Sequence, residues 1–234
     1  MMAIFRRELG SYFSSPVGYV VIAAFLSFSG LFFYYYCLYA GSSNMNIVFQ
    51  NMFSVVMFII PILTMRLFAE DRKTKTDQAL LTSPVKIGSI VMGKYLSAMI
   101  ILLICLCSYL VEGLILSFIA HPDWSVILGN IFGMLLLGSV FVSIGIMVSS
   151  LTESMVIAAV ASFAINILLS LVDALASTVN TEGARSFISS LSLQTKYNSI
   201  TLGIISLGDV VFFVTLTALF LFITDRIIER RRWA

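Results

Sequence analysis

The sequence predicts an all-α integral membrane protein, and three observations carry this prediction. Hydrophobic residues make up 59% of the 234 residues and charged residues only 11%, whereas an average soluble domain carries about 25% charged residues. The apolar residues lie in long runs, and a run of about 20 residues spans a bilayer as a helix. The Lys and Arg residues are concentrated in a few segments between these runs.

Six apolar runs are long enough to be membrane-spanning helices. We place them at Val17–Tyr39, Ile47–Met65, Met92–Ile119, Ile127–Ser149, Ser154–Ala176 and Asp209–Asp225. The first run follows Arg6 and Arg7, as in a signal peptide, but it is longer than the 7–15 apolar residues typical of a signal sequence. We therefore expect it to be a retained span within one membrane domain, residues 17–234.

The distribution of basic residues predicts that both termini are cytoplasmic. Cytoplasmic segments of membrane proteins are enriched in Lys and Arg, and an even number of spans returns the chain to its starting side. With the N-terminus inside, only Arg185 and Lys196 of the 14 basic residues fall outside. The inner set comprises Arg6, Arg7, Arg66, Arg72, Lys73, Lys75, Lys86, Lys94, Arg226, Arg230, Arg231 and Arg232.

The N-terminal segment, residues 1–16, has the pattern of an amphipathic helix on the membrane surface. Its apolar residues fall in an arc of about 120° on a helical wheel, and Arg6 and Arg7 lie opposite. The arc comprises Met1, Met2, Phe5, Leu9, Tyr12 and Phe13. Pro16 ends this elbow helix before the first span. The alternative is a disordered basic leader.

Residues 66–93 form a cytoplasmic segment that is rich in charges of both signs. Thr74 stands three residues before Asp77, a spacing like that of a capping box, and apolar Leu80 and Leu81 follow. We expect a short helix at about residues 75–82, closed by Pro84. The alternative is a solvated charged loop, but a loop would leave the two leucines without a packing partner.

The stretch from Gly88 to Lys94 has the glycine and lysine spacing of a nucleotide-binding P-loop. The residue after Lys94 is Tyr95, where a P-loop needs Ser or Thr, and no strand precedes the stretch. We therefore expect no nucleotide site. Instead, Lys94 is expected to open the third span, with its ammonium at the lipid headgroups.

Residues 177–208 form an external segment that is polar overall but contains apolar patches around Phe187, Leu191 and Ile200. Such patches favour short re-entrant helices that dip back toward the membrane, where irregular backbone survives only if it is buried in protein or lines a cavity.

Polar residues inside the spans are candidates for function. Glu112 is the only acid well inside an apolar run, and ionisable groups there are functional candidates. The alternatives are pairing with Arg185 or Lys196, or a place at the interface. The fifth run carries a polar helical face of Ser162, Asn166, Ser170 and Asp173. This face either lines a substrate pathway or holds helices together.

The sequence carries few signs of catalysis. His121 is the only histidine, which excludes zinc sites of the H-E-x-x-H type. Cys37, Cys105 and Cys107 lie inside apolar runs, where their spacing suggests neither a disulfide framework nor a metal site. No basic cluster interleaved with aromatics indicates nucleic-acid binding. We expect no catalytic residue, metal or cofactor in this chain.

Several segments together resemble the ABC-2-type permeases, and more narrowly the gliding-motility-associated permeases. The resemblance rests mainly on residues 64–86, Thr-Met-Arg-Leu-Phe-Ala-Glu-Asp-Arg-Lys through Ser-Pro-Val-Lys, followed by Gly93 and Lys94. It extends to Phe5–Phe13 with Ser15-Pro16, Ser149–Thr152, Gly203–Phe212 and Glu229–Trp233. Lys75-Thr76 departs from the Gly-Thr common in the family, which leaves the local turn open.

The resemblance implies a six-span permease subunit of an ABC transporter in a bacterial inner membrane. It implies an elbow helix, a coupling helix between spans two and three, and external re-entrant helices. The partners it implies are a second permease protomer, two copies of a cytoplasmic ATPase that bind ATP and Mg, and an accessory membrane subunit with an extracytoplasmic domain. Export is the expected direction, while the substrate is open.

The resemblance also assigns contact with the ATPase to the cytoplasmic segment. The residues concerned are Glu70, Asp71, Arg72, Lys73, Thr74, Asp77, Leu80, Leu81 and Pro84. The competing hypotheses are a stand-alone secondary transporter or channel, which usually shows midplane charges or broken helices, and a membrane enzyme or structural anchor.

Overall fold

A computed structural model of the chain describes residues 2–76, 86–178 and 192–232, and the regular structure in these ranges is helical. The elements are α1 (Met2–Ser14), α2 (Pro16–Phe33), the π-helix η1 (Tyr34–Tyr39), α3 (Asn46–Thr64), α4 (Arg66–Lys73), α6 (Ile87–Leu106), α7 (Ser108–Ile119), α8 (Trp124–Leu151), α9 (Met155–Thr178), α11 (Leu193–Thr201) and α12 (Leu207–Arg232). The prediction of an all-α fold is confirmed.

Six helical stretches within the described residues are long and apolar enough to cross a membrane. They are Pro16–Tyr39, Asn46–Lys73, Ile87–Ile119, Trp124–Leu151, Met155–Val172 and Leu207–Arg232. Each contains most of one predicted span. Ser15 caps the first of them, with its hydroxyl accepting a hydrogen bond from the Val17 amide, and Pro16 occupies the first turn, where its missing N–H costs nothing.

The structure differs from the sequence prediction around the charged segment. Residues 66–73 continue the second span as α4, with only a break at Met65, and α6 begins at Ile87 rather than Met92. The last helix also runs on to Arg232. Charge density alone does not end a helix, because Lys, Arg and Glu are good helix formers.

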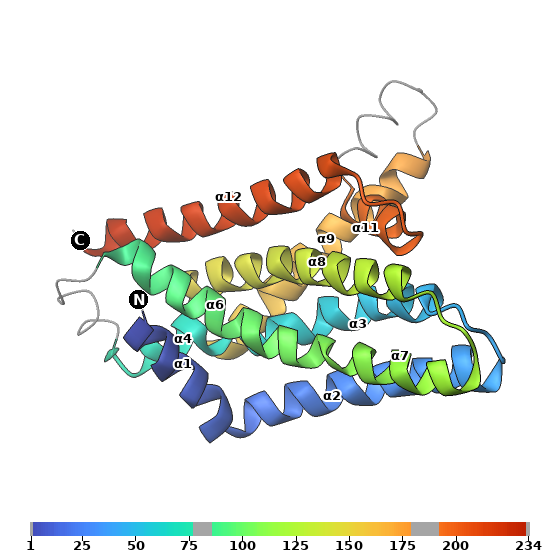
Figure 1. Cartoon of the computed structure of the whole chain (residues 1–234). Coiled ribbons are helices and arrows are strands. Elements are labelled where there is room, and N and C mark those ends of the chain that lie inside the picture. The colour runs from blue at the N-terminus through green and yellow to red at the C-terminus, as the bar shows by residue number, and fades with distance from the viewer. Residues whose placement is uncertain (1, 77–85, 179–191, 233–234) are drawn as a thin grey trace.

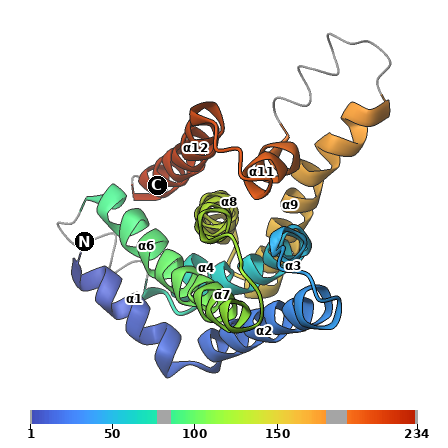
Figure 2. The same cartoon turned by 45° about the vertical axis from the view of Figure 1, so that its right-hand side comes forward.

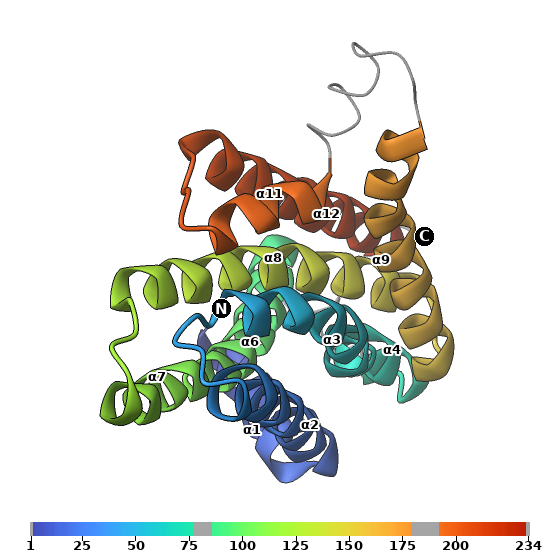
Figure 3. The same cartoon turned by 90° about the vertical axis from the view of Figure 1, so that its right-hand side faces the viewer.

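Helix α8 lies at the centre of the bundle (Figure 2). Figure 3 shows it between α11 and α12 on one side and α3 and α6 on the other. In its apolar window 78% of residues are buried, against 17% for α9 and for α12. Small residues permit this close packing: a methyl group at Gly145 would collide with the Thr64 hydroxyl of α3.

The two ends of the bundle differ in the elements that they carry. Both termini, α1 and α4 lie at one end, and the α2–α3 and α7–α8 connections lie at the other (Figure 1). This agrees with an even number of spans. At the second end, α11 packs on α8 and buries Leu193, Tyr197 and Ile200. This short helix matches part of the predicted external region, whose residues 179–191 lie outside the described ranges.

Candidate functional site: the junction at the base of the second span

The predicted coupling segment begins with α4, and α8 holds the first turn of this helix in place. A helix begins with backbone N–H groups that lack partners within the helix. The Ser149 hydroxyl, near the end of α8, accepts hydrogen bonds from the amides of Phe68 and Ala69, each at 3.1 Å. It donates to the Met65 carbonyl at 2.9 Å. One side chain thus bridges the break between α3 and α4.

A buried lysine joins α4 to α1 and α6. Lys94 of α6 is 0% exposed, and its Nζ lies 3.0 Å from Glu8 Oε1 of α1 and 2.6 Å from Asp71 Oδ2 of α4. It also donates to the Leu67 carbonyl, and it lies 4.9 Å from the centre of the Phe68 ring. A buried charge persists only with such partners.

The expectation that Lys94 lies at the lipid headgroups is therefore wrong. A lysine near the end of a span usually extends its ammonium toward water. Here α1 crosses α6 so closely that a methyl group at Gly93 would lie 3.2 Å from the Ile4 side chain and 3.4 Å from the Phe5 amide nitrogen. This crossing covers Lys94 and brings Glu8 to its side.

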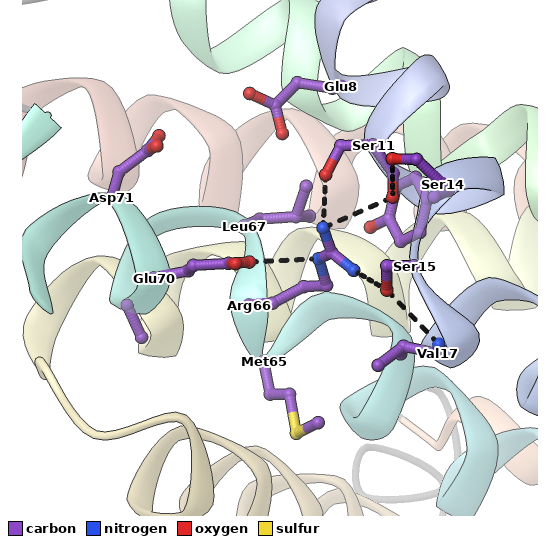
Figure 4. A network of polar contacts seen from close by, with 12 residues as sticks. Glu8, Ser11, Ser14, Ser15, Val17, Met65, Arg66, Leu67, Glu70 and Asp71 are labelled. Carbon is purple, nitrogen blue, oxygen red and sulfur yellow. Dashed lines mark hydrogen bonds and ion pairs between the residues drawn. The ribbon is translucent and has the colours of Figure 1, made fainter. Parts of the chain in front are cut away.

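Arg66, at the start of α4, makes the second connection to α1 (Figure 4). Its guanidinium donates to the hydroxyls of Ser11 and Ser15. It also pairs with Glu70 at 3.2 Å and lies 5.4 Å from the centre of the Tyr12 ring. The five donors of a guanidinium suit this role, because they reach several acceptors at once.

Tyr12 links the elbow helix directly to the second span. Its ring is buried, and its hydroxyl donates to the Leu63 carbonyl of α3 at 2.9 Å. Burial raises the pKa of the Tyr12 phenol well above its usual range, so the hydroxyl keeps its proton and remains a donor. Together with Lys94 and Arg66, Tyr12 makes α1 part of the junction rather than a loosely attached surface helix.

The described part of the predicted coupling set is divided between partly buried residues that form ion pairs and exposed residues. Asp71 binds Lys94 and Glu70 binds Arg66, as described above. Arg72 reaches Glu153, between α8 and α9, at 2.8 Å. Lys73 and Thr74 are exposed, and the Thr74 hydroxyl donates to the Glu70 carbonyl. The other predicted residues, Asp77, Leu80, Leu81 and Pro84, lie outside the described ranges.

Glu8, Ser11 and Ser149 were not predicted as site residues, and the burial of Lys94 was not predicted either. The pair of Gly93 and Lys94 carries a usable signal, because a glycine in a helix often marks a close backbone approach that also covers its neighbours. Ser149 and Glu8 carry no comparable local signal, since each acts on an element far away in the sequence.

The polar face of α9 is turned partly into the protein. Ser162 and Asn166 are fully buried. The Asn166 amide lies 3.4 Å from the Met57 carbonyl of α3, whereas Ser162 and Ser170 donate to carbonyls of their own helix. The side chain of Asp173 lies outside what the structure describes. Asn166 therefore contributes to helix packing, and a substrate pathway along this face remains an expectation.

Glu112 has a different neighbour from those expected. It is 7% exposed, and the Ser29 hydroxyl of α2 donates to its Oε1 at 2.6 Å. Lys196 instead pairs with Asp209 at 2.8 Å, so the suggested pairing of Glu112 with Lys196 is wrong. Arg185 lies outside the described ranges.

Six spans, a helical extension of the second span and an elbow helix bound to it define a multi-pass membrane subunit. A family model described as ABC-2 family transporter protein matches residues 20–224. The chain therefore belongs to the ABC-2 transporter family, as a membrane permease subunit. A search of curated proteins finds no match to the chain.

Proposed function

We propose that this chain forms half of the substrate pathway of an ABC exporter, driven by a separate cytoplasmic ATPase. The observation that carries the proposal is the buried junction of α1, α4, α6 and α8, because it turns α4 into a rigid lever at the base of the bundle. ATP and Mg would bind to the ATPase alone. Two permease protomers and two ATPase subunits would form the complete transporter.

The junction explains how movement of the connection between α4 and α6 reaches the spans. Lys94 binds α4 and α1 from within α6, and Ser149 binds the α3–α4 break from α8. A push on residues 74–86 would therefore displace the bases of the second, third and fourth spans together. Packed helices respond in this way because interiors are close-packed and hardly compressible.

The ATPase would contact the segment in two ways. The exposed charge of Lys73 and hydroxyl of Thr74, at the end of α4, would set partner choice and orientation together with Asp77. Leu80 and Leu81 would be the apolar anchors, because buried side chains carry most of the binding energy of an interface. Pro84 would end the coupling helix.

We further propose that both termini face the cytoplasm of a bacterial cell and that the protein lies in its inner membrane. The support is the concentration of basic residues at the end of the bundle that carries both termini (Figure 1). The resemblance to gliding-motility-associated permeases supports an accessory membrane subunit with an extracytoplasmic domain. The second protomer would be either an identical chain or a homologue.

The double substitution Leu80→Asp and Leu81→Asp tests the coupling role. Two charges in an apolar contact would each cost more than the roughly 1.4 kcal/mol that corresponds to a tenfold change in affinity. We expect at least about tenfold less ATPase to co-purify with the permease from native membranes, while the permease still inserts. The measurement is quantitative mass spectrometry of the purified complex, which also identifies the ATPase.

The matched control is Arg226→Gln with Glu229→Gln, which removes an exposed ion pair on α12 at the same end of the bundle. This control should retain the ATPase. Full retention of ATPase by the leucine variant would contradict the coupling assignment. Transport by the permease alone, driven by an ion gradient without any ATPase, would contradict the proposed function itself and favour a secondary transporter.

A further inference from the structure

Between α2 and α7 the protein buries a carboxyl group that belongs to the third membrane-spanning stretch. Glu112 lies about 10 Å along the helix from the end of α7 at Ile119, and Ser29 lies about 15 Å from Tyr39, at 1.5 Å per residue. The apolar core of a bilayer is about 30 Å thick. Both residues lie within helical stretches that are long and apolar enough to cross this core, on helices that pack against each other.

The carboxyl group is only half satisfied by hydrogen bonds. Oε1 accepts from the Ser29 hydroxyl at 2.6 Å. Oε2 is buried and has no hydrogen-bond partner among the described residues, and the same holds for the hydroxyl of Tyr109, one helical turn earlier in α7. Buried polar atoms without a hydrogen-bond partner are rare in protein interiors.

Neutral and apolar groups surround the carboxyl group on the neighbouring elements. The centre of the Tyr109 ring lies 4.3 Å from the ring centre of Phe49 in α3 and 5.9 Å from that of Phe25 in α2. Trp124 and Ile127 of α8 pack against Gly113, the residue after Glu112. The nearby titratable groups are Tyr109 and the Cys37 thiol of η1, which are uncharged in their ordinary state at pH 7.

No Lys, Arg or His of the described residues forms an ion pair with Glu112. An isolated carboxylate in apolar surroundings costs many kcal/mol, and such a group takes up a proton instead. Burial of the protonated carboxyl group costs much less than burial of the carboxylate, because the group is then neutral and only its hydroxyl lacks a partner. A single hydrogen bond from Ser29 does not replace a counter-ion.

We propose that Glu112 is an intramembrane proton-binding site, protonated and neutral while α2 and α7 are packed together. Separation of the two helices would admit water, and the carboxyl group would then release its proton to that water. The site thus links the protonation of one carboxyl group to the contact between the first and third spans. The site consists of Glu112 and its neighbours alone and needs no ATPase partner.

Dicyclohexylcarbodiimide tests the proposal on the full-length protein in lipid nanodiscs. This apolar reagent takes the proton of a carboxylic acid, and the carboxylate oxygen then bonds to its central carbon, so it marks protonated carboxyls within membranes. We expect the adduct on the peptide that carries Glu112, and we expect labelling to fall at least several-fold as the pH is raised. The readout is peptide mass spectrometry.

Two variants make the result specific. Glu112→Gln preserves the shape of the side chain and should abolish the adduct, whereas Glu153→Gln, which changes an exposed carboxyl paired with Arg72, should leave labelling unchanged. Absence of the adduct on Glu112 in the wild-type chain would overturn the proposal, even if Glu112→Gln failed to fold. An adduct on Glu8 at a similar level would also overturn it, because the reagent would then not distinguish the two environments.

Discussion

The junction at the base of the second span and the Glu112 site both bury a glutamate, but they stabilise it in opposite ways. At the junction, Glu8 lies 3.0 Å from the Lys94 ammonium, and Asp71 binds the same nitrogen. At the other site, Glu112 has a serine hydroxyl as its one described partner. The first arrangement is an ion cluster, and the second is a neutral polar group inside the membrane.

The difference separates a fixed connection from a responsive one. Removing Lys94 from the ion cluster leaves two carboxylates at the junction with only the half-exposed Arg7 as counter-ion, which is a large penalty in a protein interior. The junction is therefore suited to transmit force between α1, α4 and α6 without opening. The α2–α7 contact at Glu112 costs far less to open, because a carboxyl group that reaches water regains its solvation by losing a proton.

The largest effect is expected from Lys94→Met at the junction. Methionine fills a similar volume but leaves Glu8 and Asp71 with only the half-exposed Arg7 as a shared cation, so the free energy of unfolding should fall by about 3 kcal/mol. The measurement is a titration with sodium dodecyl sulfate in mixed micelles, followed by tryptophan fluorescence. Lys86→Met is the control, since the Lys86 side chain is exposed and its loss should change stability by less than about 0.5 kcal/mol. Equal stability of the Lys94→Met and Lys86→Met variants would contradict the stabilising role of the ion cluster at the junction.

A smaller effect is expected from Ser149→Ala, which removes the bridge between α8 and the α3–α4 break. The variant loses two accepted hydrogen bonds and one donated bond at a buried position, so unfolding should become easier by about 1–3 kcal/mol. The adjacent substitution Ser150→Ala is the matched control, because Ser150 donates only to the Met147 carbonyl of its own helix. The same titration measures both, and a loss in Ser150→Ala as large as in Ser149→Ala would show that general helix packing explains the effect.

The smallest effect is expected at the Glu112 site. Ser29→Ala removes the hydrogen bond to Glu112 but separates no ions, so the free energy of unfolding should fall by about 1 kcal/mol. Ser27→Ala, on an exposed position of the same helix, should be close to neutral. A loss of 3 kcal/mol or more in Ser29→Ala would indicate that Glu112 is charged in the folded protein. That outcome would remove the contrast between the two sites.

The spans and the elbow helix could be predicted from sequence because bilayer thickness and helical periodicity act on neighbouring residues. The run of apolar residues before Tyr39 and the amphipathic pattern around Tyr12 each carry this local information. Glu112 could also be selected from the sequence, because it is the only acid well inside an apolar run. Its partner Ser29 was not, because 83 residues separate the two in the chain.

The junction could be predicted only in part. Asp71 and Arg72 belong to the charged segment that the family resemblance selected, but the reason for their importance lies in Lys94 and Glu153, on other elements. A lysine near the end of a span usually extends its ammonium toward water, and this rule predicted the wrong environment for Lys94. The crossing of α1 over Gly93, together with the contacts from α4, explains why this ammonium is buried.

A double-mutant cycle between Lys94 and Asp71 tests the central claim most directly, namely that a buried ion cluster joins the lever helix α4 to the third span. The free energies of unfolding are measured for the wild-type chain, Lys94→Met, Asp71→Asn and the double variant. The buried cluster predicts a coupling energy of about 2 kcal/mol or more between the two positions. Additivity within about 0.5 kcal/mol would contradict it.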